Sequence, residues 1–177
     1  MPKSSKEGKV EILEWCKSLD NVNTIVDIGA GSGTYHKLLA KKNAVFPNAN
    51  WIAIEAWTDY ISKFSLNEKY KTVINQDART IDFTRIDNID LTIMGDMLEH
   101  MTKEDAITLV NNVSKSSRFA IISIPIIHYP QDAYEGNPYE IHVKDDWSHT
   151  EVIETFPNII KTFQGSEIGC YLLEFKK

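Results

Sequence analysis

The stretch VDIGAGSGTYH (26–36) combines a carboxylate, Asp27, with glycines at every second position, Gly29, Gly31 and Gly33. Glycine leaves the backbone bare and permits positive φ angles, so such a loop can wrap closely around a ligand. The residues before the glycines predict a buried strand, and TYHKLLAKK after them predicts a helix whose first N–H groups are unpaired. These residue types and spacings therefore predict a ligand-binding loop between a strand and a helix.

Two common phosphate-binding loops do not fit this spacing. A nucleoside triphosphate loop needs GxxxxGK followed by Ser or Thr, and the first lysine after the glycines is Lys37. A dinucleotide loop has the spacing GxGxxG, whose third glycine would fall on Thr34. An NAD-linked enzyme with a deviant loop and a purely structural strand-to-helix turn remain as alternatives.

The elements that must position this loop alternate along the chain. Short runs rich in Val and Ile are separated by helical patterns, which is typical of a parallel sheet covered by helices on both faces. The last two runs, about 158–163 and 168–175, are joined by a turn too short for a crossover helix, so they are expected to pair antiparallel. We expect an α/β fold: a three-layer α/β/α sandwich with a seven-stranded, mostly parallel sheet and a C-terminal antiparallel hairpin. The runs expected to be parallel are 24–29, 50–55, 71–75, 91–95 and 118–123.

The segment DIGAGSG (27–33) resembles the first motif of the class I S-adenosylmethionine-dependent methyltransferases, which have a Rossmann-like fold. The resemblance covers roughly residues 24–124, with further matches at the ends of the second, third and fourth expected strands. It implies that the loop wraps the methionine and ribose parts of S-adenosyl-L-methionine (SAM) and that S-adenosyl-L-homocysteine (SAH) is the product. It also implies the seven-stranded sheet with a terminal hairpin.

The same resemblance assigns roles to residues at the strand ends. Glu55 is expected to accept hydrogen bonds from both ribose hydroxyls, and Asp77 to bind the adenine amino group. The segment DLTIMGDMLEHM (90–101) is expected to lie beneath the sulfonium and the substrate. Structural roles remain as alternatives: Asp27 can organise the loop amides, Asp77 can belong to an ordinary turn, and Tyr35 can pack against the leading helix. The full expected cofactor-binding set is Asp27, Gly29, Ala30, Gly31, Gly33, Tyr35, Glu55, Ala56, Trp57, Asp77, Ala78, Asp96 and Met97.

A long connection, residues 124–147, follows the fifth expected strand. It contains three tyrosines, three prolines and two histidines, and loops of this length in a compact domain are usually lids or binding loops. Three histidines lie near the expected mouth of the site, and each is a candidate general base for a hydroxyl nucleophile. They are His100, His128 and His142, and a structural or merely exposed histidine is the alternative for each.

The other candidate sites are weak. His36 and His149 are expected on helix surfaces. No metal-ligand spacing links the histidines of the expected mouth with Asp96, Asp132 or Glu140, so no metal is expected.

The composition bounds the class of protein. The chain fits one domain over residues 1–177, with a leading amphipathic helix within 1–22 and the lid at 124–147. The formal net charge of -6 disfavours a nucleic-acid partner, because the overall field repels phosphate. Two distant cysteines, a polar N-terminus and the lack of a long apolar run predict a cytoplasmic protein without membrane contact.

Together these features predict an enzyme that transfers a methyl group from SAM to an oxygen or nitrogen of a small-molecule or sugar-like acceptor. The Pro-Pro-aromatic motif with which some family members hold a planar base or amide is absent, since GDML (95–98) stands at its place. Two alternatives remain: a methyltransferase that acts on protein or RNA with a partner subunit, and a non-catalytic SAM-binding subunit whose lid is a protein interface. A protein partner or a homodimer is compatible with these interpretations.

Overall fold

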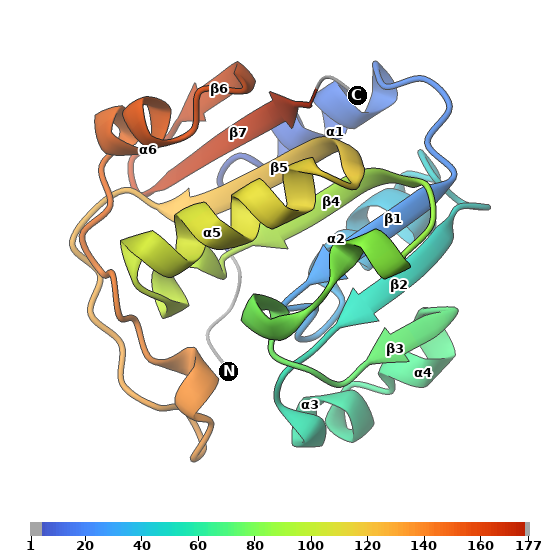
Figure 1. Cartoon of the computed structure of the whole chain (residues 1–177), viewed down its shortest axis with the longest axis horizontal. Coiled ribbons are helices and arrows are strands. Elements are labelled where there is room, and N and C mark those ends of the chain that lie inside the picture. The colour runs from blue at the N-terminus through green and yellow to red at the C-terminus, as the bar shows by residue number, and fades with distance from the viewer. Residues whose placement is uncertain (1–4, 176–177) are drawn as a thin grey trace.

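Seven strands form one sheet at the centre of the computed structural model, which describes residues 5–175 (Figure 1). The order across the sheet is β3-β2-β1-β4-β5-β7-β6, so the direction of strand addition reverses beside β1. The expected fold class, with seven strands and a C-terminal hairpin, is confirmed. The strands are β1 (Thr24–Ile28), β2 (Asn50–Ile54), β3 (Thr72–Ile74), β4 (Ile89–Gly95), β5 (Ser117–Pro125), β6 (Ile159–Gln164) and β7 (Ile168–Glu174).

The central strands are parallel and covered on both faces. In β1, Val26 lies opposite Ile52 of β2 on one side and opposite Thr92 of β4 on the other. Almost all residues of these strands are buried, which explains why their sequences do not alternate between apolar and polar residues. The last strand, β7, runs antiparallel between β5 and β6.

The sheet divides the hydrophobic core into two clusters, one between each face and the helices that cover it. Figure 1 shows α5 (Lys103–Ser114) crossing in front of β4 and β5, and Leu109 of α5 and Val152 of α6 (His149–Thr155) belong to the core on that face. The opposite core contains Ile12, Leu39 and Leu66. These three come from α1 (Lys9–Lys17), the π-helical turn η1 (Lys37–Lys42) after α2 (Thr34–His36), and α4 (Leu66–Lys69), while α3 (Thr58–Lys63) precedes α4.

Polar caps fix the starts of the two helices on the first face. The hydroxyl of Thr102 accepts the N–H of Asp105 at 3.1 Å, and the hydroxyl of Ser148 accepts the N–H of Glu151 at 3.1 Å. The Glu151 carboxylate pairs with Lys103 at 2.8 Å, which joins α6 to α5.

The expected surface position of His36 is wrong. Its side chain is only 5% exposed, because α2 turns it inward between Trp51 and Tyr70, with ring centroids at 5.1 and 5.0 Å. His149, at the start of α6, is half-buried, and its Nδ1 lies 2.8 Å from the hydroxyl of Tyr171.

The lid passes over the carboxyl ends of the strands. Because β5 extends to Pro125, the connection begins at residue 126, and its one regular element is the 3-10 turn η5 (Pro138–Glu140). It is the orange segment at the lower left of Figure 1. Trp147, which is 1% exposed, anchors its end in the core. Within residues 5–175, no helix is both long and apolar enough to cross a membrane.

Candidate active site

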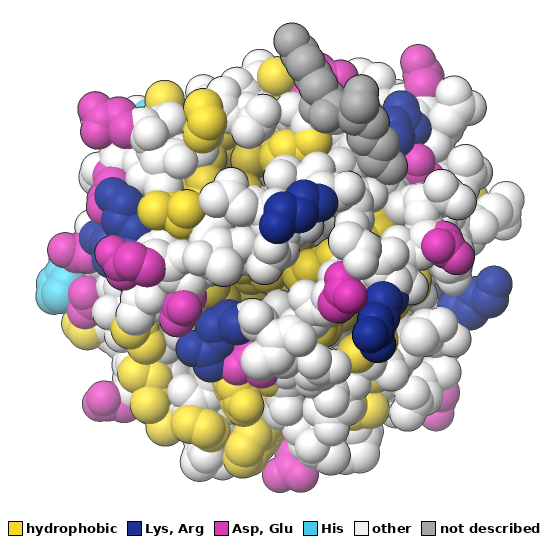
Figure 2. Space-filling view, viewed as in Figure 1, with side chains coloured by type: hydrophobic (Ala, Val, Ile, Leu, Met, Phe, Trp, Pro, Cys, Tyr) yellow, Lys and Arg dark blue, Asp and Glu magenta, His cyan; other side chains and the backbone are white. Residues whose placement is uncertain are grey.

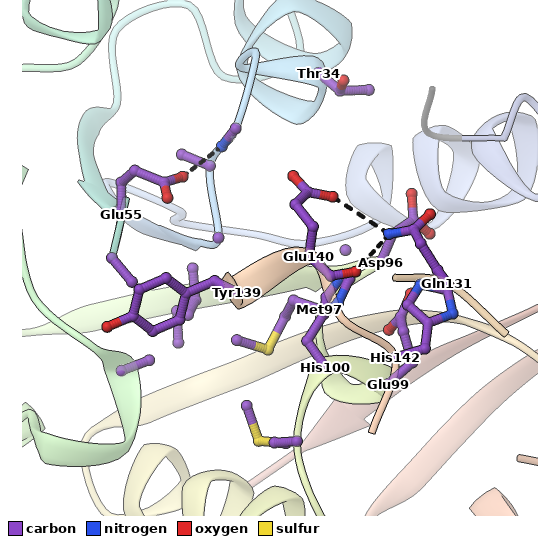
Figure 3. A pocket seen from close by; sticks show the side chains of 18 of the residues that line it. Thr34, Glu55, Asp96, Met97, Glu99, His100, Gln131, Tyr139, Glu140 and His142 are labelled. Carbon is purple, nitrogen blue, oxygen red and sulfur yellow. Dashed lines mark hydrogen bonds between the residues drawn. The ribbon is translucent and has the colours of Figure 1, made fainter. Parts of the chain in front are cut away.

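A cavity of about 380 Å³ lies at the carboxyl ends of β1, β2, β4 and β5, where the strand order reverses. The glycine loop, the ends of β2 and β4, and the lid form its walls (Figure 3). Its volume is within the range of small-molecule sites, roughly 300–1,000 Å³. The expected site residues that line it are Gly29, Ala30, Gly31, Tyr35, Glu55, Ala56, Asp77, Ala78, Asp96, Met97, His100 and His142.

The three loop glycines all have left-handed φ angles, 66° at Gly29, 49° at Gly31 and 77° at Gly33. A Cβ at Gly29 would lie 3.2 Å from the Cβ of Met97, and a Cβ at Gly33 would lie 3.3 Å from Lys69. A Cβ at Gly31 would meet only the carbonyl oxygen of Gly29, at 3.8 Å. Gly31 therefore keeps a face of the cavity open, whereas Gly33 permits the start of α2 and does not line the cavity. The cavity therefore gives no support to the expected contact between Gly33 and the cofactor.

Glu55 organises the loop from the end of β2. Its Oε2 accepts the N–H of Gly31 at 2.9 Å, drawn as a dashed line in Figure 3, and its Oε1 accepts the N–H of Trp57 at 2.9 Å. An ionised carboxylate has about four acceptor positions, so two remain for a ligand in the cavity. Burial raises the pKa of Glu55, and the two N–H groups oppose that shift.

Asp27 lies behind the loop and does not line the cavity. Its buried carboxylate accepts a hydrogen bond from the hydroxyl of Tyr70 at 2.6 Å, and burial raises the pKa of Asp27 to about 7. The same hydroxyl would lie 3.4 Å from a Cβ at Gly33. Asp27 is therefore not placed to contact a cofactor directly. Its position fits the alternative role, which is to support the glycine loop.

On the side of the cavity expected to hold adenosine, two residues have other contacts than predicted. Trp57 does not line the cavity, because it contributes its backbone N–H to Glu55 while its side chain stays outside. Asp77 lines the cavity, but its carboxylate accepts the Nε–H of Arg79 at 3.0 Å, and this contact lowers the pKa of Asp77. The turn role that was the alternative for Asp77 is thus present in the structure.

Tyr35 forms part of the cavity wall and also packs against the leading helix, as its alternative role predicted. The ammonium group of Lys9 donates to the Tyr35 hydroxyl at 2.5 Å and lies 3.9 Å from the carboxylate of Asp96. A Cβ at Gly95 would lie 1.9 Å from the Tyr35 ring, so only glycine fits at that end of β4. Tyr35 packs between the leading helix and β4. Gly95 lines the cavity within the expected segment 90–101, whereas Lys9 supports Tyr35 from outside the cavity and was not predicted.

A polar cluster lies at the other end of the cavity. The turn η4 (Leu98–His100) carries Glu99 and His100, and the lid places His142 against them, with the two imidazole centroids 4.8 Å apart. Burial lowers the pKa of His100 to about 4 and raises the pKa of Glu99 well above its usual value. The Ser123 hydroxyl donates to Asp96 at 3.0 Å at the edge of this cluster.

His128 is the one predicted catalytic histidine that the structure does not bring to the cavity. Its side chain is 70% exposed and lies 3.7 Å from the Asp145 carboxylate. The chain has already left β5 at this point and the side chain is turned to solvent, so nothing in the structure supports the predicted catalytic role of His128.

Further polar groups close the lid over the cavity. The Tyr60 hydroxyl donates to the Glu140 carboxylate at 2.8 Å, and the Gln131 amide donates to the backbone oxygen of Glu140 at 2.6 Å. Figure 3 shows Glu140 and Gln131 on the lid side of the cavity, facing Asp96 and Met97. Tyr60 and Glu140 are 80 residues apart, so no local sequence signal links them.

The strand order, the glycine loop and the acidic residue at the end of β2 define an α/β protein of the class I methyltransferase type. Residues 26–120 match the family model described as Methyltransferase domain. The match spans more than half of the chain, so the chain belongs to the methyltransferase-domain family, an enzyme class whose methyl donor is SAM. No curated protein matches the chain significantly.

Solved structures share the fold at low sequence identity. An S-adenosylmethionine-dependent methyltransferase from Clostridium acetobutylicum is 14% identical with a TM-score of 0.70, over 99% of this chain and 94% of that one. Magnesium protoporphyrin IX methyltransferase from Synechocystis, solved with bound SAM, is 14% identical with a TM-score of 0.66, over 96% and 79%. The N-terminal domain of EvdMO1, solved with SAH, is 12% identical with a TM-score of 0.68, over 97% and 82%.

The cavity residues fit the cofactor of this family. The open face at Gly31 admits close approach to the backbone, and Glu55 has acceptor positions left for two hydroxyls. Acidic side chains outnumber basic ones among the described lining residues, which suits a sulfonium cation. The acidic ones are Glu55, Asp77, Asp96, Glu99, Glu140 and Glu167, and the basic one is Arg79.

Proposed function

We propose that this protein transfers a methyl group from SAM to an oxygen or nitrogen of a small-molecule acceptor. The observation that carries the proposal is one cavity with two chemically different ends. One end has the bare backbone of Gly31 and the carboxylate of Glu55, and the other has Asp96, His100 and His142 beneath the lid. The first end suits the cofactor and the second suits a polar acceptor.

SAM supplies an activated methyl group, so the chain must mainly align the acceptor and exclude water. Glu55 holds the loop against the cofactor through the Gly31 N–H. The lid, tied down by the bond between Tyr60 and Glu140, covers the acceptor end. Burial lowers the pKa of His100 to about 4, so its imidazole is neutral near pH 7 and offers a nitrogen lone pair at the acceptor end.

Calorimetric titration of the purified protein with SAM, SAH and NAD tests the cofactor half of this proposal. Micromolar binding of SAM and SAH with no binding of NAD is the expected result. Binding of NAD alone, or of none of the three, would contradict it. Release of SAH in the presence of small hydroxylated and amine acceptors, added one at a time, then tests the acceptor half.

A second candidate is a methyltransferase subunit that acts on a macromolecule presented by a partner. Six large apolar side chains of the lid are partly exposed, and Figure 2 shows hydrophobic side chains gathered at the lower left, over the lid. Exposed apolar groups on a loop beside a cavity favour a protein contact there. A partner that co-purifies in stoichiometric amount, with turnover only in its presence, would support this candidate. The side chains are Ile127, Tyr129, Tyr134, Tyr139, Ile141 and Val143.

A further inference from the structure

Three metal-ligating side chains converge at the acceptor end of the cavity. One ligand atom each from Glu99, His100 and His142 lies within 4.8 Å of the other two. Two of the residues are neighbours on η4, and the third comes from the lid, so only the closed lid completes the group. Figure 3 shows the three side chains together beside Asp96.

The Glu99 carboxyl group has an unsatisfied oxygen. The residue is 2% exposed, and among the described residues its Oε2 has no hydrogen-bond partner. Leaving a carboxyl oxygen buried and unpaired costs about 1–3 kcal/mol or more, so native proteins rarely keep one without a reason. A cation bound between Glu99 and the two histidines would satisfy this oxygen.

Backbone groups orient both histidines. The Nδ1 of His142 contacts the carbonyl oxygen of Tyr129, which leaves Nε2 as the atom available to a ligand. The Nδ1 of His100 lies 3.2 Å from the carbonyl oxygen of Ile141. A hydrogen bond from one ring nitrogen to a backbone carbonyl is the usual support of a metal-binding histidine.

We infer that Glu99, His100 and His142 bind a divalent transition-metal ion, such as Zn²⁺ or Mn²⁺, at the acceptor end of the cavity. Two imidazoles and one carboxylate form a ligand set that leaves coordination positions open. All three residues line the cavity at the end assigned above to the acceptor. The sequence pattern alone predicted no metal, because His142 lies far from the other two ligands in the chain.

The site would narrow the acceptor class, and this step rests on the proposed function. A hydroxyl bound at an open position has a lowered pKa and loses its proton to water. Its oxygen then forms the bond to the methyl carbon as the carbon–sulfur bond breaks, and the electron pair of that bond stays on the sulfur of SAH. We therefore expect an acceptor with a hydroxyl, or two neighbouring oxygens, rather than an amine.

Calorimetric titration of the chelator-treated, full-length protein with Zn²⁺ and, separately, Mn²⁺ tests the metal site without any activity assay. The wild type should bind one equivalent of at least one of these ions. His142→Ala and the isosteric Glu99→Gln should each bind that ion at least 10-fold more weakly. His128→Ala is the matched control, since it removes an exposed histidine from the same lid, and it should bind like the wild type.

The outcomes separate the metal site from the proposed function. Failure of the wild type to bind either ion, or equal binding by the wild type and His142→Ala, would overturn the metal site. Urea unfolding of each variant shows whether it is folded, and His142 is a lid residue that belongs to neither core cluster. SAM is titrated into the same metal-free protein. Binding of SAM without binding of a metal ion would refute only the metal site. Binding of a metal ion without binding of SAM would refute only the proposed cofactor.

Discussion

Replacement of Glu55 by glutamine tests how the glycine loop is held open for the cofactor. The carboxylate accepts one backbone N–H on each oxygen, from Gly31 and from Trp57, both at 2.9 Å. Glutamine has the same shape but presents an NH₂ group in place of one oxygen, and an NH₂ group cannot accept either N–H. One loop amide therefore loses its partner, and one acceptor position for a ribose hydroxyl is lost with it.

The expected cost follows from these two losses. Loss of a hydrogen bond to a charged group costs about 1.5–3 kcal/mol, so we expect the free energy of unfolding of the ligand-free protein to fall by about that amount. Loss of the acceptor position should weaken SAM binding by roughly 1–3 kcal/mol, which corresponds to about a 5- to 150-fold higher Kd. Urea unfolding measures the first quantity and calorimetric titration with SAM measures the second.

Asp59→Asn is the matched control, because it removes the same charge from an exposed position on the adjacent helix α3 that does not line the cavity. It should change neither quantity appreciably. A Glu55→Gln variant that binds SAM as tightly as Asp59→Asn does would refute the assignment of Glu55 to the cofactor. A loss of stability without any loss of affinity would assign Glu55 a structural role only.

Three further predictions concern the glycine loop and the strands beside it. Gly31→Ala should abolish or strongly weaken SAM binding and cost about 1–2 kcal/mol of stability, because its methyl group points into open cavity space at a φ of 49°. Gly95→Ala should instead destabilise the fold by about 1–3 kcal/mol or more, since its methyl group would lie 1.9 Å from Tyr35. Equal effects of the two variants on the free energy of unfolding and on SAM affinity would contradict the binding role of Gly31 and the structural role of Gly95. Burial raises the pKa of Asp27 to about 7, above its value in the unfolded chain, so the folded state binds the proton more tightly. The free energy of unfolding of the wild type should therefore fall by up to about 1.4 kcal/mol per pH unit as the pH rises from 4 to 7. Asp27→Asn, which can still accept the Tyr70 hydrogen bond, should lack this dependence and gain stability relative to the wild type from pH 5 to pH 8 in urea unfolding; a constant difference over that range would refute the pKa shift.

The sequence by itself determined the fold and one half of the site. The apolar runs without alternation indicated strands of a covered parallel sheet, and the short turn between the last two strands required an antiparallel pair. The spacing of Gly29 and Gly31 and the place of Glu55 at the end of β2 were local signals, and all three residues line the cavity. These features depend on residues near one another in the chain, where local physical rules apply.

The tertiary structure alone decided the other half of the site. Nothing in the local sequence separated His142, which is half-buried and lines the cavity, from the exposed His128, or linked Glu140 with Tyr60. Asp27 had the right spacing for a cofactor contact, but its carboxylate lies behind the loop, where it accepts a hydrogen bond from Tyr70. Contacts of this kind join segments that are distant in the chain, and their geometry is set by how the lid and helices pack on the sheet. The cofactor end of the cavity is thus determined by local sequence, and the acceptor end by long-range packing.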